Sequence, residues 1–121
     1  MPGIWHSGGV DTTKTEWLSV PDVAENLETT PGKVRRLVEE HALLGRKIDG
    51  IFVIPAALLE RGEPLAGVAG TATVLLDGGW GLDETLDWLL AHHDELGVTP
   101  IEALRWGRKT EVRRIAQLLA L

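Results

Sequence analysis

The sequence contains no cysteine among its 121 residues. This absence excludes disulfide bonds and zinc sites built on thiolates, and it fits a reducing cytosol. No apolar run approaches the ~20 residues that a membrane-spanning helix needs. The most apolar segment is interrupted by Gly67, Gly70, Thr71 and Thr73. The first residues also lack the apolar core of a signal peptide. We therefore expect a soluble, cytoplasmic protein.

The sequence also lacks the residue arrangements that most enzyme sites require. Gly78-Gly79 is not followed by the Lys-Ser/Thr of a phosphate-binding loop, and no nucleophile stands beside a base. A metal cluster would have to draw on Asp83, Glu84, Asp87, His92 and His93. Adjacent histidines project about 100° apart on a helix, so both cannot bind one ion together with these acids. We expect neither catalysis nor a bound metal or cofactor.

Positive charge is scarce overall but concentrated in one segment. The formal net charge is −6 at pH 7, which argues against a protein that coats nucleic acid indiscriminately. Residues 33–47 nevertheless carry an excess of three positive charges. The basic residues there are Lys33, Arg35, Arg36, Arg46 and Lys47, against Glu39 and Glu40. Any contact with nucleic acid is therefore expected on one face and should weaken with salt.

Two short helical patterns lie on either side of a tight turn. The first places Val20, Val23, Ala24 and Leu27 on one stripe, with Pro21 in the first turn. The second begins with Thr30 as the cap and Pro31 as the first helical residue. Its stripe is Val34, Leu37, Val38 and His41. If Val34 points inward, Gly32 and Arg36 point away from the core, with Lys33 and Arg35 on the flanks.

A β-hairpin is predicted directly after these helices. Residues 44–48 and 51–55 are β-rich runs joined by Asp49-Gly50, which is a strong signal for a two-residue hairpin turn. In this register Lys47 lies opposite Phe52 and Arg46 lies opposite Val53. Both basic residues therefore belong to the first strand of the hairpin, residues 44–48.

The segments Trp17–Ala24 and Thr30–Val38 resemble the winged helix-turn-helix of excisionase and MerR-type proteins. Together with Thr99–Arg108 and Glu111–Arg114, they are similar to a small actinobacterial DNA-binding family that joins a winged helix to an uncharacterised helical domain. The resemblance covers residues 17–121. It implies a transcription regulator that binds double-stranded DNA, with residues 30–41 in the major groove and residues 44–55 on the backbone or minor groove. The implied DNA contacts are Thr30, Lys33, Arg35, Arg36, Arg46 and Lys47.

A second interpretation of the same arginines needs no DNA. Arg35 with Glu39, and Arg36 with Glu40, stand four residues apart and could form ion pairs that only keep a surface helix soluble. Such pairs contribute about 0.2–0.5 kcal/mol, so a nearby phosphate could displace them.

The remaining sequence predicts a helical extension. We expect a short helix from Pro55 to about Glu60, a break at residues 61–64, and a buried helix over residues 65–76. Further helices are predicted from Leu82 to His93, from the capping box at Thr99–Glu102, and beyond Gly107. The expected fold is mainly α, with a winged helix-turn-helix that carries a two-stranded β-hairpin. The expected parts are a tail at 1–16, the winged helix at 17–62 and a helical domain at 63–121.

A second basic cluster lies near the C-terminus and surrounds Trp106. Its members are Arg105, Arg108, Lys109, Arg113 and Arg114. Basic groups beside an aromatic ring suit nucleic acid. The alternative is a solvated basic face in which Trp106 is anchored in the core.

The N-terminal tail contains Thr12, Thr13 and Thr15, which are candidate sites for a Ser/Thr kinase. A phosphate there would add about −1.5 to −2 charges beside the helix-turn-helix and oppose DNA binding. The alternative is a threonine-rich tail without modification. For the whole chain, the alternative to a DNA-binding regulator is a protein-interaction module, in which the C-terminal helices bind a partner or form a homodimer.

Overall fold

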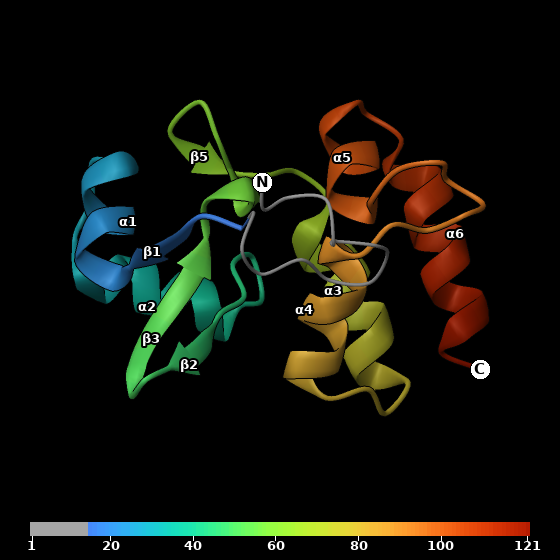
Figure 1. The fold of residues 1–121 in the computed structure, drawn as a ribbon, viewed down its shortest axis with the longest axis horizontal. Helices are drawn as coiled ribbons and strands as arrows, with labels where there is room; N and C mark the ends of the chain where they lie inside the picture. The colour runs from blue at the N-terminus through green and yellow to red at the C-terminus, as the bar shows by residue number, and fades with distance from the viewer. Residues whose placement is uncertain (1–14) are drawn as a thin grey trace, which may run out of the picture.

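The computed structural model describes residues 15–121 and divides them between two sides (Figure 1). The first side holds the three-stranded sheet and the first two helices: β1 (Trp17–Ser19), α1 (Val20–Asn26), α2 (Pro31–Glu39), β2 (Arg46–Ile48) and β3 (Ile51–Pro55). The second side holds α3 (Val68–Asp77), α4 (Leu82–Leu90), α5 (Pro100–Arg105) and α6 (Lys109–Leu119). The expected tail lies outside the described residues, except for Thr15 and Glu16.

The two helices of the predicted helix-turn-helix begin where their caps place them. The Ser19 hydroxyl accepts a hydrogen bond from the Asp22 amide at 3.2 Å, and the Thr30 hydroxyl accepts one from the Lys33 amide at 3.2 Å. Each cap satisfies one of the amides that a helix start leaves without a partner. His41 adopts a left-handed backbone (φ 63°) just after α2 and turns the chain toward the sheet.

The sheet has the strand order β1-β3-β2 and the expected hairpin register. Lys47 lies opposite Phe52 and Arg46 lies opposite Val53, while Asp49 and Gly50 take the positive φ angles of a two-residue turn. The expectation of two strands was incomplete, because β1 adds a third strand that pairs Trp17 with Pro55. Strand β1 has only three residues, which is too few for its sequence to show the alternating pattern of a strand.

The last segment of the first side, which leads to α3, differs from the expected short helix over Pro55 to Glu60. A 3-10 helix covers only Ala56–Leu58. The chain then forms a small hairpin between β4 (Leu59–Glu60) and β5 (Glu63–Pro64). Arg61 and Gly62 make its turn with positive φ angles, so the predicted break is a hairpin turn.

The C-terminal helices follow the predicted order with shifted ends. Helix α3 begins at Val68, later than expected, after Gly67 adopts a φ of 95°. Helix α4 ends at Leu90 rather than His93, because the His93 amide donates to the Val98 carbonyl instead. The capping box at Thr99 is confirmed by two reciprocal 3.0 Å bonds with Glu102. No helix within residues 15–121 is long and apolar enough to cross a membrane.

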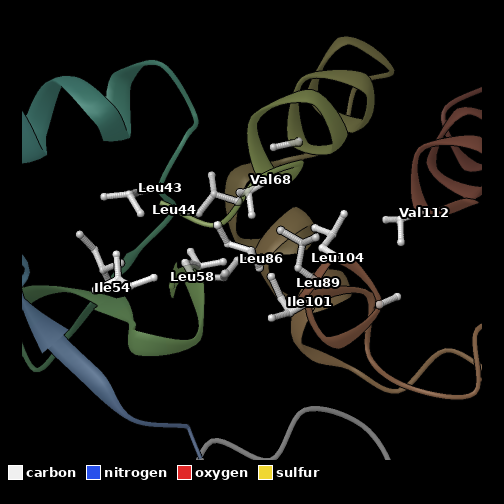
Figure 2. Packing of buried hydrophobic residues seen from close by; sticks show 14 of the residues in the cluster. Leu43, Leu44, Ile54, Leu58, Val68, Leu86, Leu89, Ile101, Leu104 and Val112 are labelled. Atoms are coloured by element: carbon white, nitrogen blue, oxygen red, sulfur yellow. The ribbon is translucent and has the colours of Figure 1, made fainter. Parts of the chain in front are cut away.

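One hydrophobic cluster runs through both sides of the protein (Figure 2). In the close-up, Leu44 and Leu58 of the first side lie beside Val68 and Leu86 of the second. Other members include Leu43, Ile54, Leu89, Ile101, Leu104 and Val112. The relative position of the two sides is therefore fixed by shared apolar packing.

The shared cluster predicts which leucine of α4 matters for stability. Leu86 is 0% exposed, whereas Leu82 in the same helix is 52% exposed. Replacing Leu86 by Ala should lower the free energy of unfolding by about 2–5 kcal/mol, because it removes buried contacts and leaves a cavity. The matched Leu82→Ala change should cost less than about 0.5 kcal/mol. Urea denaturation of both variants measures this, and equal losses would contradict the packing described.

Candidate nucleic-acid interface

Helix α2 presents a basic face to solvent. Val34 is fully buried and anchors the helix, whereas Lys33, Arg35 and Arg36 are exposed on its other sides. Gly32 is exposed as well, with no neighbour near the position of a Cβ except the Thr30 hydroxyl at 3.9 Å. The orientation deduced from the helical period is the one observed.

These cations have no acidic partner within residues 15–121. Among residues 15–121, neither Arg35 with Glu39 nor Arg36 with Glu40 forms an ion pair. Lys33 is likewise without an ion pair in this part of the chain. The ion pairs named in the soluble-helix interpretation are therefore not formed among the described residues, while the exposure of the arginines fits a solvated helix face as well as a DNA-binding one. The exposed face of α2 carries uncompensated positive charge.

The β2–β3 hairpin stands beside α2 across an open groove of about 470 Å³. Val38 and Arg35 of α2 line this groove together with Ile51 and Phe52 of β3. Lys47 of β2 is exposed and, among the described residues, forms no ion pair. Ile51, next to the turn, is 59% exposed. Helix and hairpin thus border one surface.

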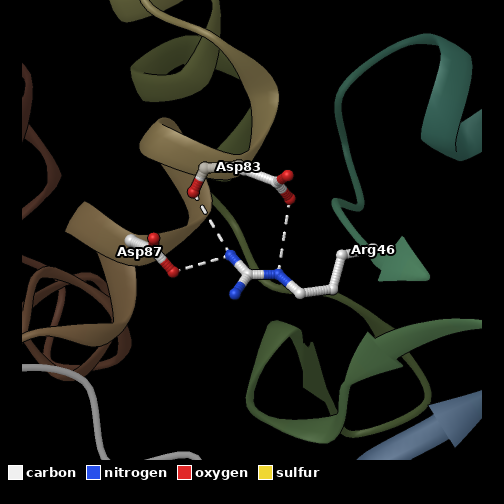
Figure 3. Close-up of polar contacts among 3 residues, drawn as sticks. All are labelled: Arg46, Asp83 and Asp87. Atoms are coloured by element: carbon white, nitrogen blue, oxygen red, sulfur yellow. Dashed lines mark hydrogen bonds and ion pairs between the residues drawn. The ribbon is translucent and has the colours of Figure 1, made fainter. Parts of the chain in front are cut away.

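Arg46, the other basic residue of β2, points away from this surface toward α4 (Figure 3). Its Nη2 donates to Asp87 Oδ1 at 2.7 Å and to the Asp83 carbonyl at 3.2 Å, and its Nε lies 3.5 Å from Asp83 Oδ1. The guanidinium also lies 5.7 Å from the centre of the Trp17 ring. Its side chain is 19% exposed. Of the two predicted hairpin contacts, only Lys47 is free toward solvent.

The second basic cluster does not form one patch. Arg105 reaches back to the first side, donating to the Ala57 carbonyl and pairing with Glu60 at 3.6 Å. Arg108 binds Glu111 at 2.9 Å, and this hydrogen bond lowers the pKa of the Glu111 carboxyl from its ordinary value. Arg114 lies 3.9 Å from Glu95.

Lys109 and Arg113 are the members of that cluster without an ion pair in the described part of the chain. They line a cavity of about 280 Å³ between α3 and α6, together with Thr71 and Thr110. Trp106 is 64% exposed, so its assignment as a core anchor was wrong. It falls at the C-terminal end of α5, where the chain turns at Gly107 toward α6 and leaves the ring outside the core.

The remaining candidates are the metal cluster, the phosphorylation sites and Thr30. Within residues 15–121, no three His, Asp or Glu side chains converge to hold a metal ion. Of the candidate phosphorylation sites, Thr12 and Thr13 lie outside the described residues, and Thr15 is partly buried just before β1. The Thr30 hydroxyl is occupied as the cap of α2.

Comparisons with known proteins match both sides of the chain. A family model described as DNA-binding protein Rv2175c, wHTH domain, matches residues 10–59. A second, described as Rv2175c C-terminal domain of unknown function, matches residues 65–120. The chain belongs to this two-domain family. Its Rv2175c-type winged helix-turn-helix therefore contains α1, α2 and the sheet, as the sequence resemblance implied.

Comparisons with Rv2175c itself, by sequence and by structure, extend the match across the chain. The DNA-binding protein Rv2175c of Mycobacterium tuberculosis (strain ATCC 25618 / H37Rv) is 29% identical over 114 residues, covering 84% of this chain and 78% of the relative. The NMR structure of Rv2175c superimposes with a TM-score of 0.81 at 26% identity, covering 100% of this chain and 97% of the other. The fold and the order of the two domains are thus those of the family.

The different surroundings of Arg46 and Arg36 predict different roles in stability. Arg46→Ala should lower the free energy of unfolding by about 1–2 kcal/mol, because charge-assisted hydrogen bonds to α4 and the Trp17 contact are lost. The matched Arg36→Ala should change it by less than about 0.5 kcal/mol, since Arg36 is exposed and unpaired. Chemical denaturation of both proteins checks this. The description fails if Arg36→Ala proves the more damaging change.

Proposed function

We propose that this member of the Rv2175c family is a transcription regulator that binds double-stranded DNA through α2 and the β2–β3 hairpin. Helix α2 enters the major groove, and the hairpin is the wing that contacts the backbone or minor groove. The observation that carries the proposal is the set of exposed, unpaired cations on the outer face of α2. Its DNA contacts are Lys33, Arg35 and Arg36, with Thr30 at the helix start and Lys47 on the wing.

The dimensions of α2 fit this role. A helix is about 10–12 Å across with its side chains, and the major groove of B-DNA is about 12 Å wide. Val34 holds α2 against the core, so the opposite side carrying Arg36 is the one that can enter a groove. Arg36 is suited to read a base edge, while Lys33 and Arg35 on the flanks are suited to phosphates. Uncompensated charge of this kind adds affinity by releasing counterions from DNA.

The C-terminal helices support a second candidate function, a contact with another protein or a second copy of this chain. Leu118 and Leu119 on α6 are 60% and 41% exposed, and Trp106 is also exposed. Large apolar side chains left in solvent are typical of interaction surfaces. We place this function in residues 63–121 and DNA binding in residues 17–62, in a cytoplasmic protein.

Phosphorylation of Thr12, Thr13 or Thr15 by a Ser/Thr kinase would add negative charge shortly before β1. A phosphate there would repel the DNA backbone and weaken binding. Phosphomimetic Glu substitutions at these threonines should lower DNA affinity if this part of the proposal holds.

Fluorescence-polarisation binding to a mixed-sequence duplex, across a salt series, tests the DNA proposal. The wild-type protein should bind with an affinity that falls with salt along a slope of about −0.9 per phosphate contacted. Joint replacement of Arg35 and Arg36 by Ala should weaken binding at least about tenfold.

A matched control removes two unpaired cations elsewhere, through Lys109→Ala with Arg113→Ala. It should leave both affinity and slope nearly unchanged. Absence of wild-type binding at low salt would overturn the DNA proposal and favour the protein-interaction function. Light scattering over a range of concentrations would then show whether a second copy is the partner.

A further inference from the structure

We infer that the C-terminal domain restrains DNA binding by holding Arg46 of the wing on the acidic pair Asp83 and Asp87 of α4. DNA phosphate and these carboxylates compete for the same guanidinium. The inference rests on the proposed DNA-binding function and gives a role to the domain of unknown function.

Arg46 is the basic residue of the hairpin whose side chain contacts the C-terminal domain. It follows Gly45 and directly precedes Lys47, so its backbone lies on the same strand as an exposed cation of the proposed interface. Neighbouring residues of a strand point to opposite faces, and Arg46 shares the face of Trp17 rather than that of Lys47. Its guanidinium ends between the carboxylates of α4 (Figure 3).

The acidic pair is held firmly in place. Asp83 and Asp87 are four residues apart in α4, so they lie one above the other on the same side of the helix. Thr85, Leu86 and Leu89 on the other side of α4 are buried in the shared core. The helix that carries both carboxylates is therefore fixed beside the hairpin by the shared core.

The hold on Arg46 is nevertheless incomplete, which leaves it open to competition. Its Nε is buried but has no hydrogen-bond partner, since the nearby Asp83 oxygen lies at 3.5 Å. Asp83 and Asp87 have side chains that are 78% and 50% exposed, and pairs in such contact with water are weak. A phosphate can accept from Nε and Nη2 together in a bidentate arrangement. If Arg46 exchanged the carboxylates for a phosphate, its Nε would gain the hydrogen-bond acceptor that it lacks beside α4.

The exposed carboxylates act on DNA in a second way. They place two negative charges beside the hairpin, where a duplex on the wing would approach. Holding Arg46 removes one positive charge from the interface, and the carboxylates repel phosphate at the same time. The experiment must separate these two effects.

A double-mutant cycle on the full chain makes that separation. Asp83→Asn with Asp87→Asn keeps side-chain size and removes the charges that hold Arg46. This protein should bind the mixed-sequence duplex about five- to tenfold more tightly than wild type, with a salt slope steeper by about 0.9 as Arg46 gains a phosphate. Arg46→Gln should change wild-type affinity less than about twofold. Added to the double Asn protein, it should remove the extra slope and most of the gain in affinity, leaving only the part that comes from lost repulsion.

The controls remove charge elsewhere and guard against misfolding. Glu63→Gln with Asp77→Asn takes away two exposed carboxylates that form no ion pair among the described residues, and should change affinity less than about twofold. The single Asp87→Asn change is the milder second variant, because it neutralises only the carboxylate of the 2.7 Å contact. It should give a smaller gain in affinity with the same dependence on Arg46.

Three results would overturn the inference. A gain from the double Asn change that survives Arg46→Gln undiminished, in affinity and in slope, would show simple charge repulsion without competition for Arg46. Wild-type affinity in the double Asn protein, while the Arg35 and Arg36 double substitution still loses binding, would reject the restraint and leave the DNA proposal standing. Failure of wild-type and double Asn proteins alike to bind DNA would reject both.

Discussion

The shared hydrophobic core is the constraint on which the rest of the structure depends. Leu43, Leu44, Ile54 and Leu58 belong to the winged helix-turn-helix, yet they form one cluster with the apolar side chains of α3–α6. A unit as small as the winged helix-turn-helix matched at residues 10–59 has little interior of its own, and small domains are correspondingly marginal. Packing against the C-terminal domain supplies the additional buried apolar surface and fixes the position of the two domains relative to each other.

The fixed position of the two domains determines which basic residues form ion pairs. On the side away from the core, α2 presents cations that form no ion pair with any acid in residues 15–121. On the side facing the C-terminal domain, Arg46 meets Asp83 and Asp87, and Arg105 meets Glu60. Basic residues at the domain junction are thus paired, while those at the proposed DNA surface are not. The packing that stabilises the fold therefore also determines which basic residues are paired at the junction and which are not.

Local features of the fold could be predicted from the sequence, while contacts between distant residues could not. The caps at Thr30 and Thr99, the outward direction of Arg36 and the hairpin register at Asp49-Gly50 all depend on neighbours within a few residues. Strand β1 was missed because its partner, β3, lies far along the chain. The partners of Arg46 are 37 and 41 residues away, and no sequence period connects them. The exposure of Trp106 also depends on tertiary packing, which composition does not reveal.

The most direct test of the central claim is a map of backbone amide chemical shifts in the ¹⁵N-labelled full chain during titration with duplex DNA. DNA on α2 and the wing, with Arg46 leaving α4, should shift the amides of residues 30–36 and 46–52, and also those of Asp83 and Asp87, which DNA need not touch. Shifts at α2 and the wing without any at α4 would contradict the competition for Arg46. Shifts confined to α5 and α6 would contradict the whole account of the interface.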